Sequence, residues 1–210
     1  MRSFKSDNFS GVHPEIFDLL QEFNADHAPS YGNDIVTEQA ERLFENVFKK
    51  PCKVAHVFNG TGANILCLRT ALRPYQSVLC SEWSHIATNE TGAAESIIGS
   101  KILTVPGRNG KIYPAEIEKR FKQESLNEIH ATQPKVLSIA QCTEYGTVYT
   151  AEELHHLRAL CNDLKLYFHM DGCRLYNAAV SLGASLAEIS SDAGVDMLSL
   201  GGTKNGAMMA

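Results

Sequence analysis

Two spacings of apolar residues recur along the chain. Short apolar runs predict buried strands, whereas apolar residues three or four positions apart predict amphipathic helices. The strand-like runs cover residues 53–58, 77–81, 101–105, 135–141, 164–170 and 196–200. The helix-like spacing covers residues 14–23, 35–48, 65–72, 86–94, 114–128 and 151–164. Because strands and helices alternate, we expect an α/β fold whose mostly parallel sheet has helices on both faces.

Two of the predicted helices carry recognisable start signals. Pro14 stands in a first helical turn, where a missing N–H group is tolerated. Thr150, followed three residues later by Glu153, predicts a capping box for the last of these helices. The turn-rich stretch before Pro14 predicts an N-terminal arm over residues 1–13. Since no linker, repeat or low-complexity run follows, residues 14–210 are interpreted as one domain.

The composition limits the classes of function. The 210 residues are 44% hydrophobic and 20% charged, which is ordinary for a soluble globular protein, and the net charge is −5. That charge gives no reason to expect a nucleic-acid or membrane partner. The six cysteines are scattered, and the sequence contains no apolar signal segment and no CxxC or HExxH motif. We therefore expect a cytoplasmic protein with reduced thiols, no bound metal and a small-molecule partner.

A carboxylate and an amine are expected at the same edge of the sheet. The run over residues 164–170 leads to Asp171, and the run over residues 196–200 leads through a Gly-Gly pair to Lys204. Ligands bind beyond the carboxyl ends of parallel strands. A lysine that forms a Schiff base and a carboxylate that keeps a pyridine nitrogen protonated suit pyridoxal phosphate. The alternative is an ordinary strand-end Asp and a solvated Lys, but the Gly-Gly pair, which lets the backbone approach a ligand closely, favours the cofactor.

Two further stretches suit a cofactor site. Asn59, Gly60 and Thr61 lie in a Gly-rich turn before a predicted helix, where backbone N–H groups and the helix dipole bind anions. This turn would seat the cofactor phosphate, although Gly-Thr-Gly turns also occur as plain connectors. His85 follows a predicted strand and lies close to the only Trp. Taken alone, it is better explained as a helix-capping or core histidine.

Seven stretches, taken together, resemble a known family. They are SDN at 6–8, SYGND at 30–34, FNGTGAN at 58–64, SHI at 84–86, TEYGTVYTAEEL at 143–154, HMDGCRLYNAAVSLG at 169–183 and LSLGGTKNG at 198–206. In this order they are similar to L-threonine aldolases, and most similar to the bacterial low-specificity type. The pairing of HMDGxR with GGTKNG is the specific part. The resemblance implies the large domain of the aspartate aminotransferase-like fold, which is pyridoxal-phosphate fold type I, with pyridoxal 5'-phosphate as the cofactor.

The resemblance also implies roles for individual residues. The catalytic residues would be Lys204, which binds the cofactor covalently, Asp171, which pairs with its pyridine nitrogen, and His85, which stacks on its ring. The cofactor would be bound by Asn59, Gly60, Thr61, His85, Asp171, Arg174, Thr203 and Lys204. The substrate would be bound by Ser6, Tyr31 and Arg174. Tyr31 and Asp34 would belong to a loop that reaches a site, often that of the neighbouring subunit.

The implied reaction is retro-aldol cleavage of a β-hydroxy-α-amino acid, such as L-threonine or L-allo-threonine, to glycine and an aldehyde. His85, directly or through a water, is our sequence-based candidate for the base that removes the hydroxyl proton. Other reactions of the same fold, namely β-elimination, transamination and hydroxymethyl transfer, stay open. A further alternative is an inactive remnant that persists only as an oligomeric module.

The sequence differs from the family at its C-terminal end. Family members continue past the lysine and add a small C-terminal domain with a further substrate-binding arginine, whereas this sequence ends six residues after Lys204. We therefore expect an incomplete large domain that lacks the small domain, with activity below that of longer members. An apolar face or a sheet edge would be left open, which favours a homodimer or homotetramer.

Overall fold

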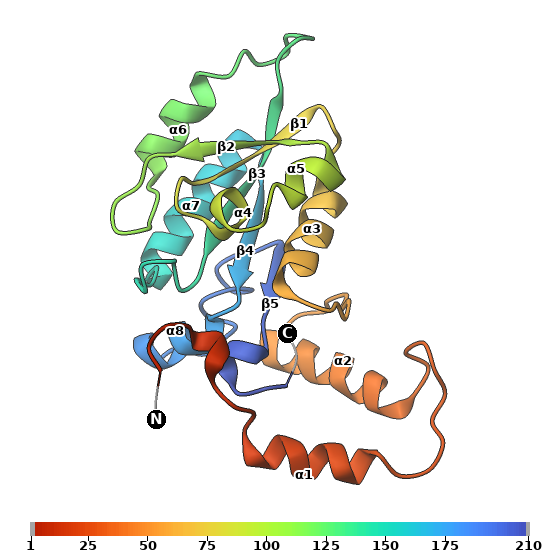
Figure 1. The fold of residues 1–210 in the computed structure, drawn as a ribbon. Helices are drawn as coiled ribbons and strands as arrows, with labels where there is room; N and C mark the ends of the chain where they lie inside the picture. The colour runs from red at the N-terminus through yellow and green to blue at the C-terminus, as the bar shows by residue number, and fades with distance from the viewer. Residues whose placement is uncertain (1–2, 209–210) are drawn as a thin grey trace.

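The computed structural model describes residues 3–208, so Met1 and Arg2 of the predicted arm, and Met209 and Ala210, lie outside the described residues. Within residues 3–208, five parallel strands form one sheet in the order β2-β1-β3-β4-β5 (Figure 1). The strands are β1 (Gln76–Ser81), β2 (Lys101–Val105), β3 (Gln133–Ala140), β4 (Tyr167–Gly172) and β5 (Met197–Leu200). The predicted α/β fold with a parallel sheet is confirmed.

Three helices have the bounds that the apolar spacing predicted, namely α1 (Pro14–Phe23), α2 (Ile35–Phe48) and α7 (Ala151–Leu164). The predicted capping box forms at the start of α7. Thr150 Oγ1 accepts from the Glu153 N–H at 3.2 Å, and Glu153 Oε2 accepts from the Thr150 N–H at 2.8 Å. The other described elements are α3 (Gly60–Ala71), α4 (His85–Thr88), α5 (Ala93–Ile98), α6 (Pro114–Lys122), α8 (Leu175–Leu182) and the 3₁₀ turns η1 (Asp7–Phe9) and η2 (Thr203–Asn205).

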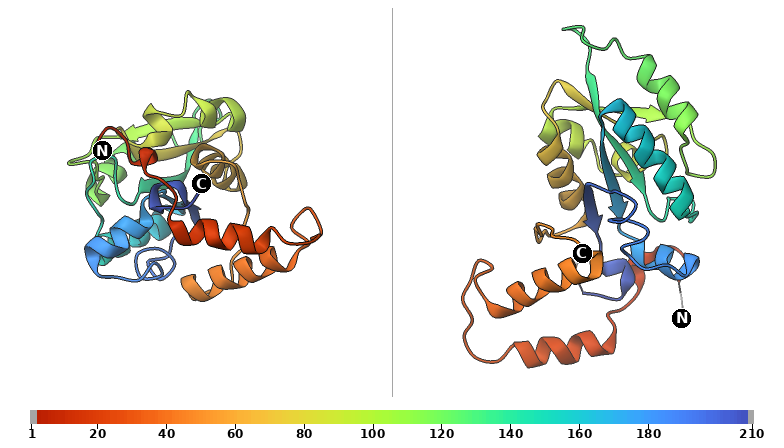
Figure 2. Two further views of the ribbon diagram at one scale, coloured as in Figure 1. Left: turned by 60° about the horizontal axis from the view of Figure 1, so that its bottom comes forward. Right: turned by 180° about the vertical axis from the view of Figure 1, so that it is seen from behind.

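Helices cover both faces of the sheet, as predicted (Figure 2). One core cluster joins the sheet to α6, α7 and α8, and a second joins it to α3, α4 and α5. Phe168 and Met170 of β4 belong to the first cluster, so the alternation of side chains along the strand turns His169 and Asp171 towards α3. Burying one large apolar side chain stabilises the fold by about 2 kcal/mol. The burial of Phe168 and Met170 therefore fixes the face of the sheet on which Asp171 lies.

The strand predicted over residues 53–58 is wrong. These residues link α2 to α3 without joining the sheet, and Phe58 is 80% exposed. Val54 and Val57 are half-buried, whereas Ala55 and His56 between them are exposed. A short apolar run indicates burial, but a strand also needs a partner strand, and the local sequence does not encode that partner.

Two helices predicted in the first half of the chain differ from those in the structure: one starts earlier, and the other is interrupted. α3 begins at Gly60 rather than at residue 65, because Asn59 caps it and accepts from the Gly62 N–H at 2.8 Å. The helix predicted over residues 86–94 is broken into α4 and α5. Thr91 and Gly92 have φ values of 52° and 70°, which a right-handed helix cannot accommodate.

The predicted helix over residues 114–128 is also too long, because α6 ends at Lys122. Beyond it, Asn127 has a φ of 66°, and its N–H donates to Gln133 Oε1 at 3.0 Å. Gln133 begins β3, so this contact ties the segment after α6 to the sheet. The spacing of apolar residues cannot reveal such a contact.

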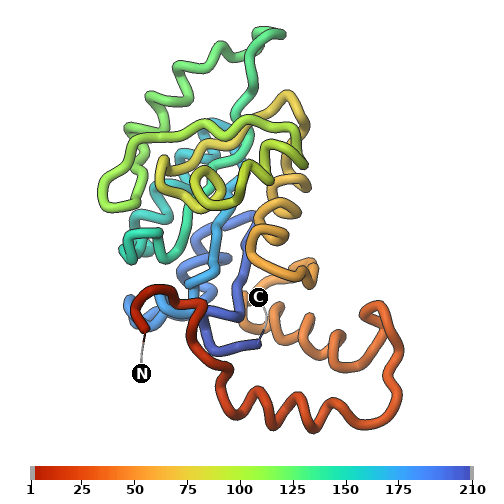
Figure 3. The backbone as a smooth tube through the Cα atoms, viewed as in Figure 1, coloured from red at the N-terminus to blue at the C-terminus, as the bar shows by residue number. Residues whose placement is uncertain are grey.

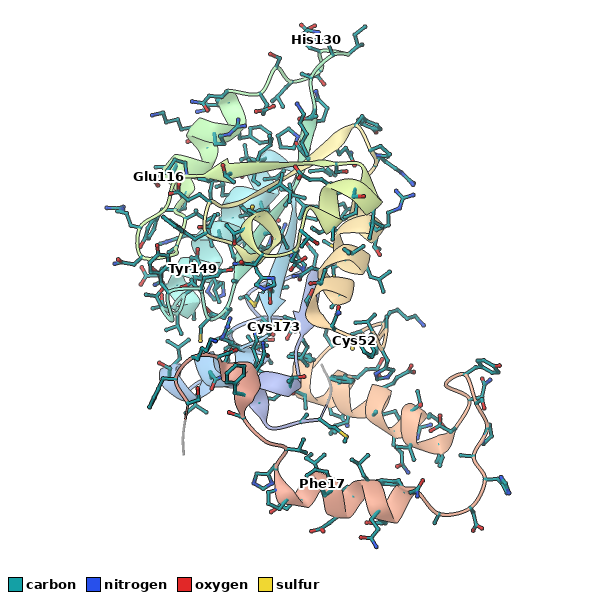
Figure 4. All side chains as sticks on the ribbon, viewed as in Figure 1. Phe17, Cys52, Glu116, His130, Tyr149 and Cys173 are labelled. Carbon is teal, nitrogen blue, oxygen red and sulfur yellow. The ribbon has the colours of Figure 1, made fainter. Side chains whose placement is uncertain are left out.

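Helices α1 and α2 extend away from the sheet (Figure 2). Phe17 lies on α1, far from the sheet (Figure 4), and is 51% exposed. Phe48 is the only buried residue of the two helices. Their exposed apolar side chains are Phe17, Leu19, Leu20, Phe23, Ile35, Val36, Leu43 and Val47. No helix in the described part of the chain has both the length and the hydropathy to cross a membrane.

The N-terminal segment returns to the C-terminal one. Turn η1 lies against η2, as the tube drawing shows (Figure 3). The His13 N–H donates to the carbonyl of Gly206 at 2.8 Å, which holds the two segments together. This contact brings the start of the chain to the edge of the sheet where Lys204 lies.

Candidate active site

A pocket of about 370 Å³ opens at the carboxyl ends of the strands. This is where ligands bind in parallel α/β sheets. Cys173, which lines it, marks this end of the sheet in Figure 4. Eight residues predicted to bind the cofactor line the pocket together: Asn59, Gly60, Thr61, His85, Asp171, Arg174, Thr203 and Lys204. Residues 145 positions apart in the sequence, Asn59 and Lys204, are thus brought to one site.

Asp171 lies at the centre of the pocket's hydrogen bonds. Its Oδ2 accepts from Asn64 Nδ2 at 3.1 Å, and its Oδ1 accepts from the Cys173 N–H at 3.0 Å. Burial works to raise the pKa of Asp171, but these two donors outweigh it, and His169 adds to their effect, so the pKa lies below its ordinary value. Asp171 is therefore held as a carboxylate that can face a positive group of a ligand.

A chain of polar side chains runs from Asp171 to His85. Asn64 Nδ2 also donates to Glu90 Oε1 at 2.8 Å, and His85 Nδ1 lies 2.8 Å from the same oxygen. Asn64 and Glu90 are 1% and 3% exposed, so the bridge is buried. The hydrogen bond to Glu90 raises the pKa of His85 against the effect of burial. The pair therefore favours a protonated His85, which donates to Glu90 through Nδ1.

The start of α3 forms an anion site. Asn59 caps the helix, and Gly60 and Thr61 come first in it, where backbone N–H groups have no carbonyl acceptor within the helix. A Cβ on Gly60 would lie 3.0 Å from Cys173 Sγ, and a Cβ on Gly201 would lie 2.9 Å from Cys173 Cα. Glycine at both positions lets α3 and the loop after β5 close on the segment after β4.

Lys204 is held in a short turn that is tied to β4. Asn205 Nδ2 donates to the carbonyl oxygens of Cys173 and Gly201 at 3.1 and 2.8 Å. These bonds fix the turn that carries Lys204 relative to the segment that follows Asp171. The amine and the carboxylate thus lie on one edge, as the two strand exits predicted.

Arg174 brings a second positive charge to the pocket. Its guanidinium forms an ion pair with Asp7 of η1, and its Nη2 lies 3.3 Å from Asp7 Oδ1. Burial works to raise the pKa of Asp7, but the hydrogen bond and charge of Arg174 outweigh it, so the pKa is lowered. Asn8, the next residue, lines the pocket. The predicted N-terminal arm therefore forms part of the site.

Three residues assigned from the resemblance lie outside the lining of this pocket. Ser6 Oγ accepts from the Asn8 N–H at 3.2 Å and caps η1. Tyr31 is 99% exposed. Asp34 caps α2 by accepting from the Thr37 N–H at 2.8 Å. The substrate roles of Ser6 and Tyr31, and the placement of the Asp34 loop at a neighbour's site, stay predictions.

Sequence reasoning missed several residues that line the pocket, chief among them Asn64, Glu90 and Glu144. Asn64 was placed just before a helix, and Glu90 inside another. Five positions separate Glu90 from His85, a spacing that does not share a helix face, so no pattern linked them. The break between α4 and α5 brings them together. Glu144 lies in the stretch TEYGTVYTAEEL at 143–154. Its polar side chain shortly after a buried strand is the sequence signal that could have identified it.

A family model described as beta-eliminating lyase matches residues 3–209. The chain belongs to the beta-eliminating lyase family. Members of this family use pyridoxal phosphate. The anion site at Gly60 and Thr61, the carboxylate of Asp171 and the amine of Lys204 supply what its phosphate, its ring nitrogen and its aldehyde require, so the residues present fit this cofactor.

Individual relatives agree with the family. A low specificity L-threonine aldolase of Pseudomonas aeruginosa is 44% identical over 206 residues, which are 98% of this chain and 59% of that protein. The structure of a threonine aldolase from Leishmania major has a TM-score of 0.90 and 36% identity, covering 100% of this chain and 60% of that one. An alanine–glyoxylate aminotransferase from Nostoc, at 19% identity and a TM-score of 0.63, shares the fold, which is pyridoxal-phosphate fold type I. This chain thus spans about three-fifths of the length of the P. aeruginosa and L. major proteins.

Proposed function

We propose that the chain carries the active site of a pyridoxal-phosphate-dependent aldolase that cleaves L-threonine or L-allo-threonine to glycine and acetaldehyde. One observation carries the proposal: Asp171, Lys204 and the N-terminus of α3 line a single pocket. The 44% identity to the P. aeruginosa low specificity L-threonine aldolase supports this choice of substrate. Such an activity belongs to threonine catabolism.

The described residues divide the work of the reaction. Bound pyridoxal phosphate supplies a positively charged ring that accepts the electron pair released at Cα. Asp171, held as a carboxylate, keeps the ring nitrogen protonated. Lys204 would be the amine that holds the cofactor covalently. Gly60 and Thr61 hold the phosphate through N–H groups, and Arg174 offers its positive charge to the substrate carboxylate.

Other reactions of the fold use the same cofactor residues, so the products decide between them. The test incubates the 210-residue chain with pyridoxal phosphate and L-threonine and measures acetaldehyde and glycine. We expect both in equal amounts, and we expect Asp171→Asn to reduce the rate by several orders of magnitude while the cofactor still binds. Formation of 2-oxobutanoate and ammonia would indicate β-elimination instead. Absence of any product from bound cofactor would favour the inactive remnant.

A homo-oligomer, either a dimer or a tetramer, is part of the proposal. The exposed apolar side chains of α1 and α2 support it, because apolar side chains that an extended helical pair exposes to solvent favour association. Tyr31 lies in the loop between these helices and would then reach a neighbouring subunit. Sedimentation analysis of the chain is the test, and a stable monomer at micromolar concentration would contradict this assembly.

We also propose a cytoplasmic location. The six cysteines are free, and none of them forms a disulfide. Free thiols are typical of a reducing compartment. Localising the tagged protein in its own cells tests this, and recovery outside the cytoplasm would contradict it.

A further inference from the structure

Glu144 is a carboxylate of the pocket to which no role has been assigned so far. It lies in the loop after β3 and lines the pocket together with His85 and Asp171. Its Oε1 accepts from the His85 N–H at 2.7 Å, which holds the side chain against the start of α4. Within residues 3–208, its Oε2 forms no hydrogen bond. One oxygen is therefore fixed, and the other is left to accept a proton from a ligand.

The surroundings of Glu144 suit proton transfer. Partial burial raises the pKa of Glu144, and the negative charge of Asp171 raises it further, against the effect of the His85 N–H. A carboxylate whose pKa moves towards neutrality is a stronger base than an exposed one. Glu144 lines the same pocket as Asp171, which is expected to bind the ring nitrogen of the cofactor. Glu144 is therefore placed to act on a substrate group next to the reacting carbon.

His85 is less suited to accept that proton. Its Nδ1 is bound to the buried Glu90, and that bond raises the pKa of His85. In its protonated form His85 has two N–H donors and no free acceptor, and the raised pKa widens the pH range over which this form is present. Over that range His85 is a donor that faces the pocket. Glu90 is buried, and its Oε1 is already bound to Asn64 and His85.

The remaining acidic groups of the pocket are also unsuitable. Asp171 is engaged by Asn64 and the Cys173 N–H and is reserved for the cofactor. Burial raises the pKa of the thiols of Cys142 and Cys173, the latter to about 12, so both are protonated near neutral pH. A protonated thiol is not a base.

The geometry points to Glu144 as the catalytic base that accepts the β-hydroxyl proton of the substrate. This inference rests on the proposed function. The proton moves from the hydroxyl to Glu144 Oε2, and the electrons of the broken O–H bond form the second C–O bond of the aldehyde. The Cα–Cβ bond breaks, and its electron pair stays with Cα. A proton taken up at Cα completes glycine, and Glu144 returns its proton to the solvent.

The test separates this step from the rest of the reaction. Exchange of the α-proton of glycine with deuterium, followed by NMR, needs the cofactor, Lys204 and Asp171 but involves no hydroxyl group. Glu144→Gln removes the charge but keeps an oxygen that can accept from the His85 N–H. We expect it to slow threonine cleavage about 100-fold or more, the usual contribution of a general base. Glycine exchange, cofactor affinity and melting temperature should stay near the parent values.

Glu152→Gln is the matched control, because Glu152 is an exposed glutamate on α7, and it should leave both reactions unchanged. Cleavage at the parent rate in Glu144→Gln would overturn the role of Glu144, most clearly if His85→Phe lost cleavage and kept exchange. Equal losses of cleavage and exchange in Glu144→Gln would overturn it too, because they would indicate a structural role. A parent chain that performs neither reaction would refute the proposed function itself, and the role of Glu144 with it.

Discussion

Asp7 and Arg174 form an ion pair across 167 positions of the sequence. The pair joins the N-terminal arm to the segment that follows β4. Because Asn8 lines the pocket and η1 lies against η2, the arm closes one side of the site around Lys204. The ion pair therefore helps to shape the pocket, besides anchoring the start of the chain.

Asp7→Asn should loosen the arm without unfolding the protein. Both side chains are about one-third exposed, and ion pairs of this kind contribute about 1 kcal/mol or less. We expect amide hydrogens of residues 6–10 to exchange with deuterium several-fold faster, while the strands keep their protection. Asp18→Asn on the exposed face of α1 is the control. Unchanged exchange in residues 6–10 would show that other contacts hold the arm.

Lys204→Ala should abolish covalent attachment of pyridoxal phosphate. Lys204 is the lysine in the pocket, and the anion site at α3 does not depend on it. Reduction with borohydride followed by mass spectrometry should therefore label the parent protein at residue 204 and leave the variant unlabelled. Lys101→Ala, at an exposed position of β2, should label like the parent. A labelled lysine in Lys204→Ala would assign the attachment to another residue.

Glu90→Gln should lower the pKa of His85, because the hydrogen bond to Glu90 is the main cause of its rise. The upward direction of this pKa shift has a consequence for stability. A raised pKa in the folded state stabilises the protein below the unfolded value near 6.5, and this contribution disappears as the pH rises through the folded pKa. NMR titration of the His85 ring should show the fall. An unchanged titration would remove Glu90 from this role.

His169 should limit the stability of the protein in acid. Its Nδ1 lies 2.8 Å from Ser138 Oγ and its Nε2 lies 3.1 Å from Ser199 Oγ, and burial lowers its pKa to about 4. A histidine that is buried in its neutral form makes the folded protein less stable as the pH falls below the unfolded pKa of about 6.5 towards the folded one. The free energy of unfolding should therefore decrease as the pH is lowered from 6.5 to 4.

In the variant His169→Gln the free energy of unfolding should change less with pH over this range. Its stability at pH 7 should also fall, because a buried side chain is replaced. His130→Gln is the control, since His130 is exposed in the loop before β3. Chemical denaturation at several pH values measures both. Parallel curves for His169→Gln and the parent protein would assign the acid sensitivity to another group.

The sequence predicted the parts of the site that depend on strand exits. Asp171 and Lys204 follow apolar runs, and the carboxyl ends of parallel strands share one edge, so their meeting needed no knowledge of the pairing order. Asn59 and Gly60 could be placed near a helix N-terminus because their Gly-rich turn is encoded locally, although the start of α3 was predicted five residues too late. The error at residues 53–58 has the opposite cause, since a strand requires a partner that the local pattern does not specify.

The buried contacts of the site lay beyond such reasoning. Asn64 and Glu90 meet because α4 stops and the chain turns through Thr91 and Gly92. A window that looks helical gives no sign of this turn. Glu144 depends on how the loop after β3 folds against α4, which is a contact between segments 59 positions apart. Positions set by tertiary contacts of this kind become visible only in the structure.

Helix α3 carries both an anion site at its first turn and, at Asn64, the amide that binds Asp171. Five positions separate the cap Asn59 from Asn64, which corresponds to about 7.5 Å along a helix axis. The helix therefore holds the anion site and Asp171 at a fixed distance from each other. A molecule that fills both must carry its anionic and cationic groups at the matching separation, so the pocket selects ligands by length as well as by charge.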